Sequence, residues 1–128
     1  MKGTILVIED NDQNMYLVTF FLKKYGYQVF QARNGQAGIA LARQINPDLI
    51  LLDIQLPVMD GYGVARELTK DGEFCHVPIV VVTSYALLSD RERALEAGCL
   101  GYIEKPINPV TFLAEIEQYL PAGKTGGR

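Results

Sequence analysis

Histidine, cysteine and long apolar stretches are all scarce in this sequence of 128 residues, and each scarcity excludes a class of protein. The single histidine, His76, has no partner residues for a catalytic or metal-binding role. The two cysteines, Cys75 and Cys99, lack the C-x-x-C spacing, so we expect reduced thiols in a cytosolic protein and no disulfide. The first apolar stretch is too short for a signal peptide or a membrane span. These absences indicate an intracellular protein that does not enter a membrane.

An excess of basic charge is also missing, since 12 Lys and Arg residues stand against 15 Asp and Glu residues, a formal net charge of −3. Direct binding of nucleic acid would need a basic surface, so we do not expect it. The length suits one domain, and 48% hydrophobic with 21% charged residues is an ordinary globular composition. We expect this domain to span residues 1–121, followed by a flexible Gly-rich tail at 122–128.

Five short apolar runs alternate with segments in which apolar residues recur at helical spacing. Three of the runs are almost continuous in Ile, Leu and Val, which is typical of parallel strands covered on both faces. We expect strands at residues 4–9, 27–32, 49–53, 79–83 and 101–104. We expect helices at residues 12–25, 35–44, 63–70, 89–98 and 109–120. This alternation predicts an α/β fold with a parallel sheet.

The ends of several expected helices carry typical start and stop residues. Asn34 and Asn108 are expected N-caps, and Pro109 suits the first position of the last helix. Gly26 and Gly98 are expected to end the helices that precede them. The helical segments therefore have readable boundaries between the strands.

The stretch LILLDIQLPVMDG, residues 49–61, ends an unbroken apolar run on a carboxylate, Asp53. Polar residues also close other expected strands: Glu9 and Asp10 after the first, Thr83 in the fourth and Lys105 after the fifth. The carboxyl ends of parallel strands emerge at one edge of a sheet, where ligands bind, so these side chains are expected to meet in one crevice. The second run ends on an alanine, as an edge strand away from the site would.

The chemistry of such a crevice follows from its charges. Three carboxylates repel each other unless a cation lies among them, and oxygen ligands at an exposed rim suit Mg²⁺. A cation beside a lysine and a hydroxyl is arranged to hold a phosphoryl group. A carboxylate can attack phosphorus directly, which explains why no catalytic histidine is needed. The residues therefore predict an Mg²⁺ site at which an aspartyl-phosphate forms.

Four motifs, in this order, resemble the receiver domain of two-component response regulators: VIEDN, PDLILLDIQLPVMDG, PIVVVTS and GYIEKPI. The match extends over about residues 4–120. The resemblance implies a flavodoxin-like (βα)5 fold, a three-layer sandwich around a five-stranded parallel sheet of order 2-1-3-4-5. It also implies a signalling switch that takes a phosphoryl group onto Asp53.

The resemblance implies a role for each polar residue at the strand ends. The roles are Mg²⁺ binding by Asp10, Asp53 and the backbone carbonyl of Gln55 with help from Glu9, phosphoryl contacts by Thr83 and Lys105, and a switch role for Tyr102. The acid pair is Glu-Asp where the family pattern has Asp-Asp, a common variant that keeps metal binding. Gln55 and Tyr85 lie where the family tunes hydrolysis of the phosphate, so the lifetime of the phosphorylated form stays open.

The expected partners are the phosphohistidine of a sensor kinase or phosphotransfer protein and a downstream target protein. We expect a cytoplasmic monomer, with dimerisation on phosphorylation left open. The protein would promote its own phosphorylation and dephosphorylation without being an enzyme in the usual sense. The sequence indicates a stand-alone receiver, since Met1 and the Gly-rich tail argue against a receiver fragment of a hybrid kinase.

Two other classes of function compete with this interpretation: a degenerate receiver, and an enzyme on the same topology that is either an FMN protein or an aspartate-nucleophile phosphatase. A degenerate receiver would be an interaction module that is never phosphorylated, but it should lack the acceptor, the lysine or the acid pair. An FMN protein should have a Ser/Thr-rich phosphate loop after the first strand, where this chain has the anionic EDNDQN. An aspartate-nucleophile phosphatase should have a second aspartate two residues after the nucleophile, where this chain has Gln55.

Overall fold

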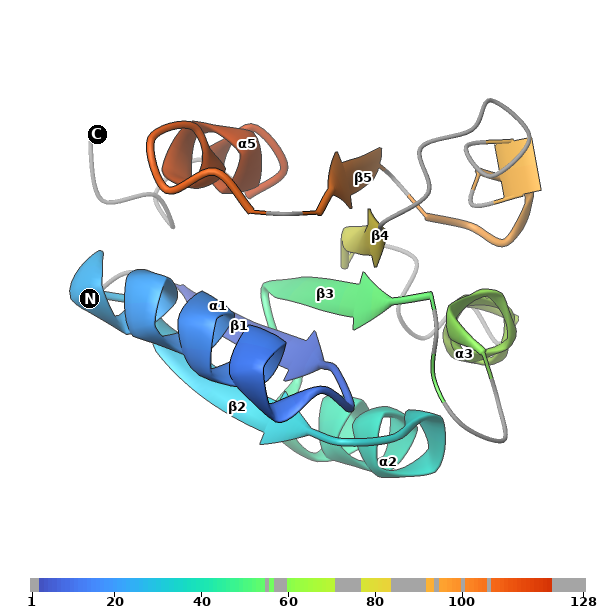
Figure 1. Ribbon diagram of the computed structural model, residues 1–128. Coiled ribbons are helices and arrows are strands. Elements are labelled where there is room, and N and C mark those ends of the chain that lie inside the picture. Colours follow the sequence, from blue (N-terminus) through green and yellow to red (C-terminus); the bar gives the residue numbers. More distant parts are fainter. Residues whose placement is uncertain are drawn as a thin grey trace.

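In the computed structural model, the chain folds into a parallel sheet with helices on both faces (Figure 1). The structure describes residues 3–54, 56, 60–70, 77–83, 92–93, 95–99, 101–105 and 107–120. Residue 83 is described by its backbone alone. The strands lie in the order β2-β1-β3-β4-β5, and each neighbouring pair is parallel. The predicted flavodoxin-like fold and its strand order are confirmed.

Each strand lies within the apolar run that predicted it. The strands are β1 (Thr4–Ile8), β2 (Gln28–Ala32), β3 (Leu49–Asp53), β4 (Ile79–Thr83) and β5 (Gly101–Glu104). The helices are α1 (Asp12–Lys24), α2 (Gly35–Ile45), α3 (Gly61–Thr69) and α5 (Phe112–Glu117). The strand β2 forms one edge of the sheet, and its end carries the uncharged Ala32, as the sequence predicted for an edge strand.

The sheet separates two apolar cores. Helices α1 and α5 cover one face, and α2 and α3 cover the other (Figure 1). Successive residues of β3 contribute to opposite cores: Leu49 and Leu51 face α1 and α5, whereas Ile50 and Leu52 face α2 and α3. All four are at most 1% exposed, which explains why the run is continuously apolar.

The expected signals at the ends of the first two helices are present. The side chain of Asn34 accepts a hydrogen bond from the backbone N–H of Ala37 at 2.8 Å and so caps α2. Gly26, with a φ of 95°, follows the C-cap of α1, a backbone conformation that favours glycine. Local capping chemistry therefore sets these boundaries.

The third helix begins two residues earlier than the predicted range of 63–70. The side chain of Asp60 accepts a hydrogen bond from the N–H of Gly63 at 2.9 Å, so α3 begins at Gly61. The prediction started at Gly63, the second of two glycines, and glycine is a poor helix former. The aspartate cap outweighs that preference.

The last helix is shorter than the predicted range of 109–120. The carbonyl of Asn108 accepts from both Thr111 and Phe112, so residues 109–111 form a tight turn ahead of α5. The other end is tightened in the same way, because Tyr119 and Leu120 donate to carbonyls three residues back. Residues 92–93 and 95–96 are helical, and Gly98 follows with a φ of 96°; the remainder of the predicted 89–98 helix lies outside the described residues.

Candidate functional site

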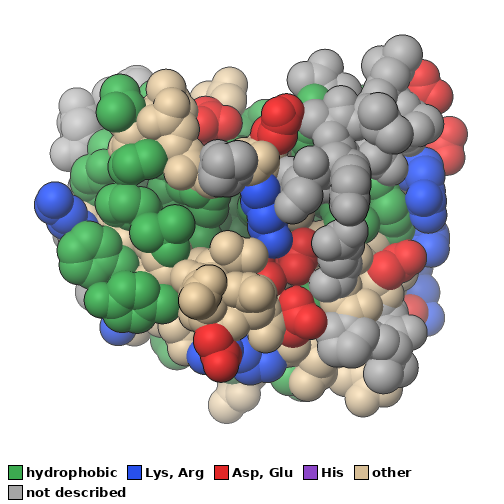
Figure 2. Space-filling model, in the orientation of Figure 1, with side chains coloured by type: hydrophobic (Ala, Val, Ile, Leu, Met, Phe, Trp, Pro, Cys, Tyr) green, Lys and Arg blue, Asp and Glu red, His purple; other side chains and the backbone are tan. Residues whose placement is uncertain are grey.

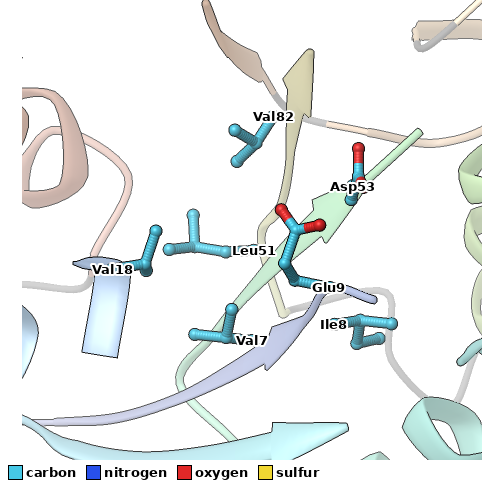
Figure 3. A pocket seen from close by; sticks show the side chains of 7 residues that line it. All are labelled: Val7, Ile8, Glu9, Val18, Leu51, Asp53 and Val82. Atoms are coloured by element: carbon cyan, nitrogen blue, oxygen red, sulfur yellow. The ribbon is translucent and has the colours of Figure 1, made fainter. Parts of the chain in front are cut away.

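Two acidic side chains lie next to each other because β1 and β3 are adjacent and parallel. Ile8 pairs with Leu52, so Glu9 and Asp53 follow at neighbouring positions of the same sheet edge. The close view in Figure 3 shows both carboxylates at these strand ends. Glu9 is 3% exposed and Asp53 is 5% exposed. Two nearly buried carboxylates side by side are costly unless positive charge compensates them.

A third carboxylate completes the cluster from the exposed side. One carboxylate oxygen each from Glu9, Asp10 and Asp53 lies within 4.8 Å of the other two. At an effective dielectric constant of 20, repulsion between Glu9 and Asp53 alone is roughly 3 kcal/mol at this separation. The convergence of residues far apart in the sequence follows from the parallel topology.

Lys105 supplies the positive charge. Its Nζ lies 3.1 Å from Oε1 of Glu9, to which it donates a hydrogen bond, and 3.4 Å from Oδ1 of Asp53. Its side chain is 15% exposed, so this contact is shielded from water much better than a surface ion pair. One ammonium against three carboxylates leaves the cluster with a formal charge of 1 − 3 = −2. The crevice therefore still attracts a further cation.

The donor set fits a small hard cation. All three side chains offer carboxylate oxygens, which Mg²⁺ prefers, and the exposed position of Asp10 leaves the outer side open to water. A softer metal would call for nitrogen or sulfur ligands, and the described residues provide none in this cluster. The residues present thus suit Mg²⁺ with part of its water shell retained.

The inner wall of the crevice is apolar. Val7, Val18, Leu51 and Val82 line a cavity of about 10 Å³ beneath the two buried carboxylates (Figure 3). Glu9 and Asp53 point to this side because each lies two residues beyond an apolar residue of the core beneath α1 and α5. A cavity of this size has room for about one water molecule. Charges in the crevice therefore act in a poorly solvated setting, where electrostatic interactions are strong.

The remaining predicted site residues are only partly described. Thr83 is the last residue of β4, and its backbone pairs with Glu104. Tyr102 on β5 is half-buried and packs against the core beneath α2 and α3, on the opposite face of the sheet from the crevice floor. Gln55, Tyr85 and the predicted tail at 122–128 lie outside the described residues, as do Cys75 and His76.

Two features of the site escaped the sequence analysis. The backbone N–H of Asn11 donates to Oε2 of Glu9 at 3.2 Å, so both oxygens of that carboxylate have partners. A Cβ at Gly61 would lie 2.5 Å from the carbonyl oxygen of Asp53, so α3 starts in direct contact with the backbone of the site. The signal for the second feature was the D-G pair at 60–61, which closes the same stretch that carries Asp53.

Cys99 is expected to be chemically inert in the folded protein. The thiol is free and 4% exposed, and burial raises its pKa to about 12. Because the thiolate is the reactive form, a raised pKa lowers the fraction available for alkylation. With iodoacetamide at pH 8, we expect Cys99 to react at least about 100-fold more slowly than in urea-unfolded protein. Peptide mass spectrometry measures both rates, and equal rates would contradict the buried position.

Comparisons with known proteins agree with this fold and site. The sequence matches the family model of the response regulator receiver domain over residues 5–117. It is 41% identical to the polar-differentiation response regulator DivK of Brucella anthropi, over 94% of this chain and 98% of that protein. The chain therefore belongs to the response regulator receiver family.

Solved structures show the same architecture. The chemotaxis protein CheY4 of Vibrio cholerae superposes with a TM-score of 0.89 at 25% identity, over 94% of this chain and 100% of that one. The receiver domain of the sensor histidine kinase PA1611 of Pseudomonas aeruginosa, with magnesium in its active-site cleft, superposes with a TM-score of 0.85 at 33% identity. The match covers 93% of this chain and 98% of that one. The Saccharomyces cerevisiae receiver of Ssk1, crystallised with the histidine phosphotransfer protein Ypd1, superposes with a TM-score of 0.85 at 29% identity. The match covers 92% of this chain and 88% of that one.

These relatives define the class of protein as a phosphorelay signalling domain. No helix in the described part of the chain combines the length and apolarity needed to cross a bilayer.

Proposed function

We propose that this receiver is switched by transfer of a phosphoryl group from a phosphohistidine onto Asp53. The observation that carries the proposal is the setting of Asp53: a nearly buried carboxylate at the end of the central strand, 3.4 Å from the ammonium of Lys105. Two further carboxylates lie beside it, and the apolar wall below limits water. This arrangement suits a carboxylate nucleophile that needs no general base, because it is already an anion.

The proposed step exchanges one bond to phosphorus for another. A carboxylate oxygen of Asp53 forms a bond to phosphorus, the phosphorus–nitrogen bond of the phosphohistidine breaks, and its electron pair returns to the imidazole nitrogen. Charge then builds up on the phosphoryl oxygens, and the ammonium of Lys105 is close enough to Asp53 to stabilise it. Lys105 keeps a negatively charged partner after the transfer, because the phosphoryl group is itself anionic.

Mg²⁺ would be held by Asp10, Asp53 and the backbone carbonyl of Gln55, with Glu9 assisting. When bound, it supplies the positive charge that the crevice lacks and offsets the charge of the incoming phosphoryl group. Glu9 orients Lys105 through the 3.1 Å hydrogen bond and is itself fixed by the N–H of Asn11. The two acids of the Glu-Asp pair would therefore have different roles: Glu9 would position Lys105, and Asp10 would face the metal and solvent.

The switch would run through Thr83 and Tyr102. Thr83 ends β4, the strand beside β3, so its hydroxyl is proposed to join Lys105 in contacting the phosphoryl oxygens. Tyr102 lies on the next strand and is half-buried, and its ring is proposed to turn inward when Thr83 moves. The phosphorylated state would then present a different surface to a downstream protein.

The wider assignments follow from this role. We assign residues 1–121 to the receiver domain and 122–128 to a flexible tail. The protein would act in the cytoplasm as a monomer, receive its phosphoryl group from a histidine kinase or a phosphotransfer protein, and signal by contact with a target protein. Its chemistry would be limited to its own aspartate.

Incubation with acetyl phosphate and Mg²⁺ tests the proposal without any partner. We expect the intact protein to gain one phosphoryl group, in a linkage that is stable in acid and lost in base, because it is an acyl phosphate. EDTA should stop the labelling, because the repulsion within the carboxylate cluster then opposes the incoming anion. Mass spectrometry measures the gain. No gain with Mg²⁺, or an equal gain in EDTA, would contradict the proposal.

A further inference from the structure

A helical segment between β4 and β5 is attached to the rest of the molecule unevenly. Its described helical residues are 92–93 and 95–96, all of them exposed, and we call these residues the exposed segment. Figure 1 shows it (orange) on the same side of the molecule as α3. The chain then enters the core beneath α2 and α3, where Ala97 is 2% exposed and Cys99 is 4% exposed. We call residues 97–99 the anchored end.

The anchored end fits closely against the last turn of α3. The hydroxyl of Thr69 lies 3.3 Å from the carbonyl oxygen of Ala97. A Cβ at Gly98 would lie 2.8 Å from Cγ2 of Thr69, so the backbone of Gly98 rests directly on that side chain. Because protein interiors are close-packed, displacing this end would break several contacts at once. The anchored end is therefore the part of the segment that is hardest to move.

The exposed segment reaches α3 through a cation–π contact. The guanidinium carbon of Arg93 lies 4.3 Å from the centroid of the Tyr62 ring, near the start of α3. Figure 2 shows Lys and Arg side chains (blue) along the edge of the molecule where α3 lies. A contact of this kind at an exposed site favours the closed arrangement by about two- to fivefold. It is thus strong enough to hold the segment in place and weak enough to open.

Tyr62 is held close to β3. The N–H of Gly61 donates to the carbonyl of Ile54, the residue after Asp53, at 2.8 Å. Gly61 also lies against the carbonyl oxygen of Asp53, and the Tyr62 side chain is 2% exposed. The ring is therefore a fixed base for Arg93, attached to the central strand of the sheet.

Arg93 belongs to a different part of the chain from its aromatic partner. The exposed segment follows Thr83 along the chain, and Thr83 is proposed to move toward the phosphoryl group. The cation–π contact coexists with the ion pair between Lys105 and Asp53, so it belongs to the unphosphorylated arrangement of the site. One partner is thus fixed to β3, and the other continues from the residue that is proposed to shift.

We propose that the contact between Arg93 and Tyr62 is a latch, which holds the exposed segment on α3 until Asp53 is phosphorylated. The inference rests on the proposed function. Movement of Thr83 would pull the segment away from Tyr62, and the segment would turn about its anchored end. Because the latch contributes only to the unphosphorylated state, its loss should favour the phosphorylated state by the strength of the contact.

The test measures how tightly Asp53 binds beryllofluoride, an analogue of the phosphoryl group, in the presence of Mg²⁺. Arg93→Gln removes the guanidinium at an exposed position, so the fold should persist. We expect this variant to bind beryllofluoride about two- to fivefold more tightly than the wild type, measured by NMR titration. Arg93→Lys keeps a cation without the planar group, so its affinity should lie between the two. A general loss of stability would not tighten binding.

Tyr62→Leu removes the other partner of the latch. In that background, Arg93→Gln should change the affinity by less than about 1.5-fold, because a double-mutant cycle isolates the pair. A full effect of Arg93→Gln in the Tyr62→Leu background would place its origin elsewhere and overturn the latch. Without beryllofluoride, amide hydrogens of the exposed segment should exchange about two- to fivefold faster in Arg93→Gln than in the wild type, and those of β3 should not change.

Arg66→Gln is the matched control. Arg66 is an exposed arginine one turn after Tyr62 on α3, and it is not part of the exposed segment. Its variant should bind beryllofluoride as the wild type does. Equal or weaker binding by Arg93→Gln would overturn the latch alone. No binding by the wild type, or equal binding by Asp53→Asn, would overturn the proposed function instead.

Discussion

Asp53→Asn is expected to take up no phosphoryl group from acetyl phosphate in the presence of Mg²⁺, a loss of at least about 100-fold against the wild type. An amide has no anionic oxygen to attack phosphorus, and the carboxylate of Glu9 is held by hydrogen bonds from Lys105 and Asn11. The side chain is 5% exposed and asparagine is nearly isosteric, so the fold should persist. Intact-protein mass spectrometry measures the phosphoryl gain over time.

The control for this variant is Asp12→Asn. Asp12 is an exposed carboxylate in the first turn of α1, near the crevice but outside the carboxylate cluster, so its variant should label normally. Peptide mapping of the labelled wild type should place the phosphoryl group on Asp53. Full labelling of Asp53→Asn, or a label on Glu9 or Asp10, would move the acceptor to another carboxylate.

Lys105→Met and Asp53→Asn are expected to change the melting temperature in opposite directions when EDTA is present. Removing the ammonium of Lys105 takes away the contact it makes with two nearly buried carboxylates and makes the formal charge of the cluster more negative, from −2 to −3. Breaking a buried pair costs 3–5 kcal/mol, and partial exposure of Lys105 reduces this to about 2–3 kcal/mol. For a domain of this size, that is a drop of about 6–10 °C.

Asp53→Asn should instead melt above the wild type. It removes one of the three mutually repelling charges and keeps the shape of the side chain, which we expect to stabilise the fold by about 1–2 kcal/mol, as often happens when a functional site is neutralised. Mg²⁺ at ten times its dissociation constant should stabilise the wild type by about 1.4 kcal/mol, and Asp53→Asn by much less. It should also restore much of the stability that Lys105→Met loses.

The matched control for the lysine is Lys70→Met. Lys70 forms an ion pair with Glu67 at 3.0 Å, but both side chains are exposed, at 58% and 38%, so the change in free energy of unfolding should stay within about 0.5 kcal/mol. Thermal denaturation of the four proteins, with EDTA and with Mg²⁺, measures every comparison. If Lys105→Met melted at or above the wild type in EDTA, repulsion between the carboxylates would not dominate the crevice.

The sheet and the location of the site were predictable because they depend on periodicity and topology. Continuous apolar runs such as 49–53 are typical of buried parallel strands, and parallel order alone sends Glu9, Asp53 and Lys105 to one edge. Individual contacts were not predictable. The spacing of the sequence does not say that Lys105 reaches both carboxylates, or that Asn11 donates to Glu9, because these depend on side-chain conformations at the edge.

The outer face of α1 was missed for a different reason. The segment MYLVTFFL is apolar around most of the helix, so helical spacing alone could not separate the buried Met15, Val18 and Leu22 from the side left in solvent. Tyr16 and Phe20 are in the same run and have the same apolar character, and only the packing of α1 on the sheet separates them from the core. Amphipathic pattern is informative only where one side of a helix is polar.

The central position of β3 in the sheet also determines which parts of the protein are expected to open to solvent. This strand is hydrogen-bonded to β1 on one side and β4 on the other, and its first four residues are at most 1% exposed. Amide hydrogens in such a strand exchange with solvent only through the largest opening motions, whereas edge strands such as β2 open more readily. The proposed acceptor, Asp53, is thus attached to the part of the chain that is expected to open least. If Asp53 is phosphorylated as proposed, the elements around a stationary aspartate are expected to change their populations, and the response of this domain is expected at its periphery.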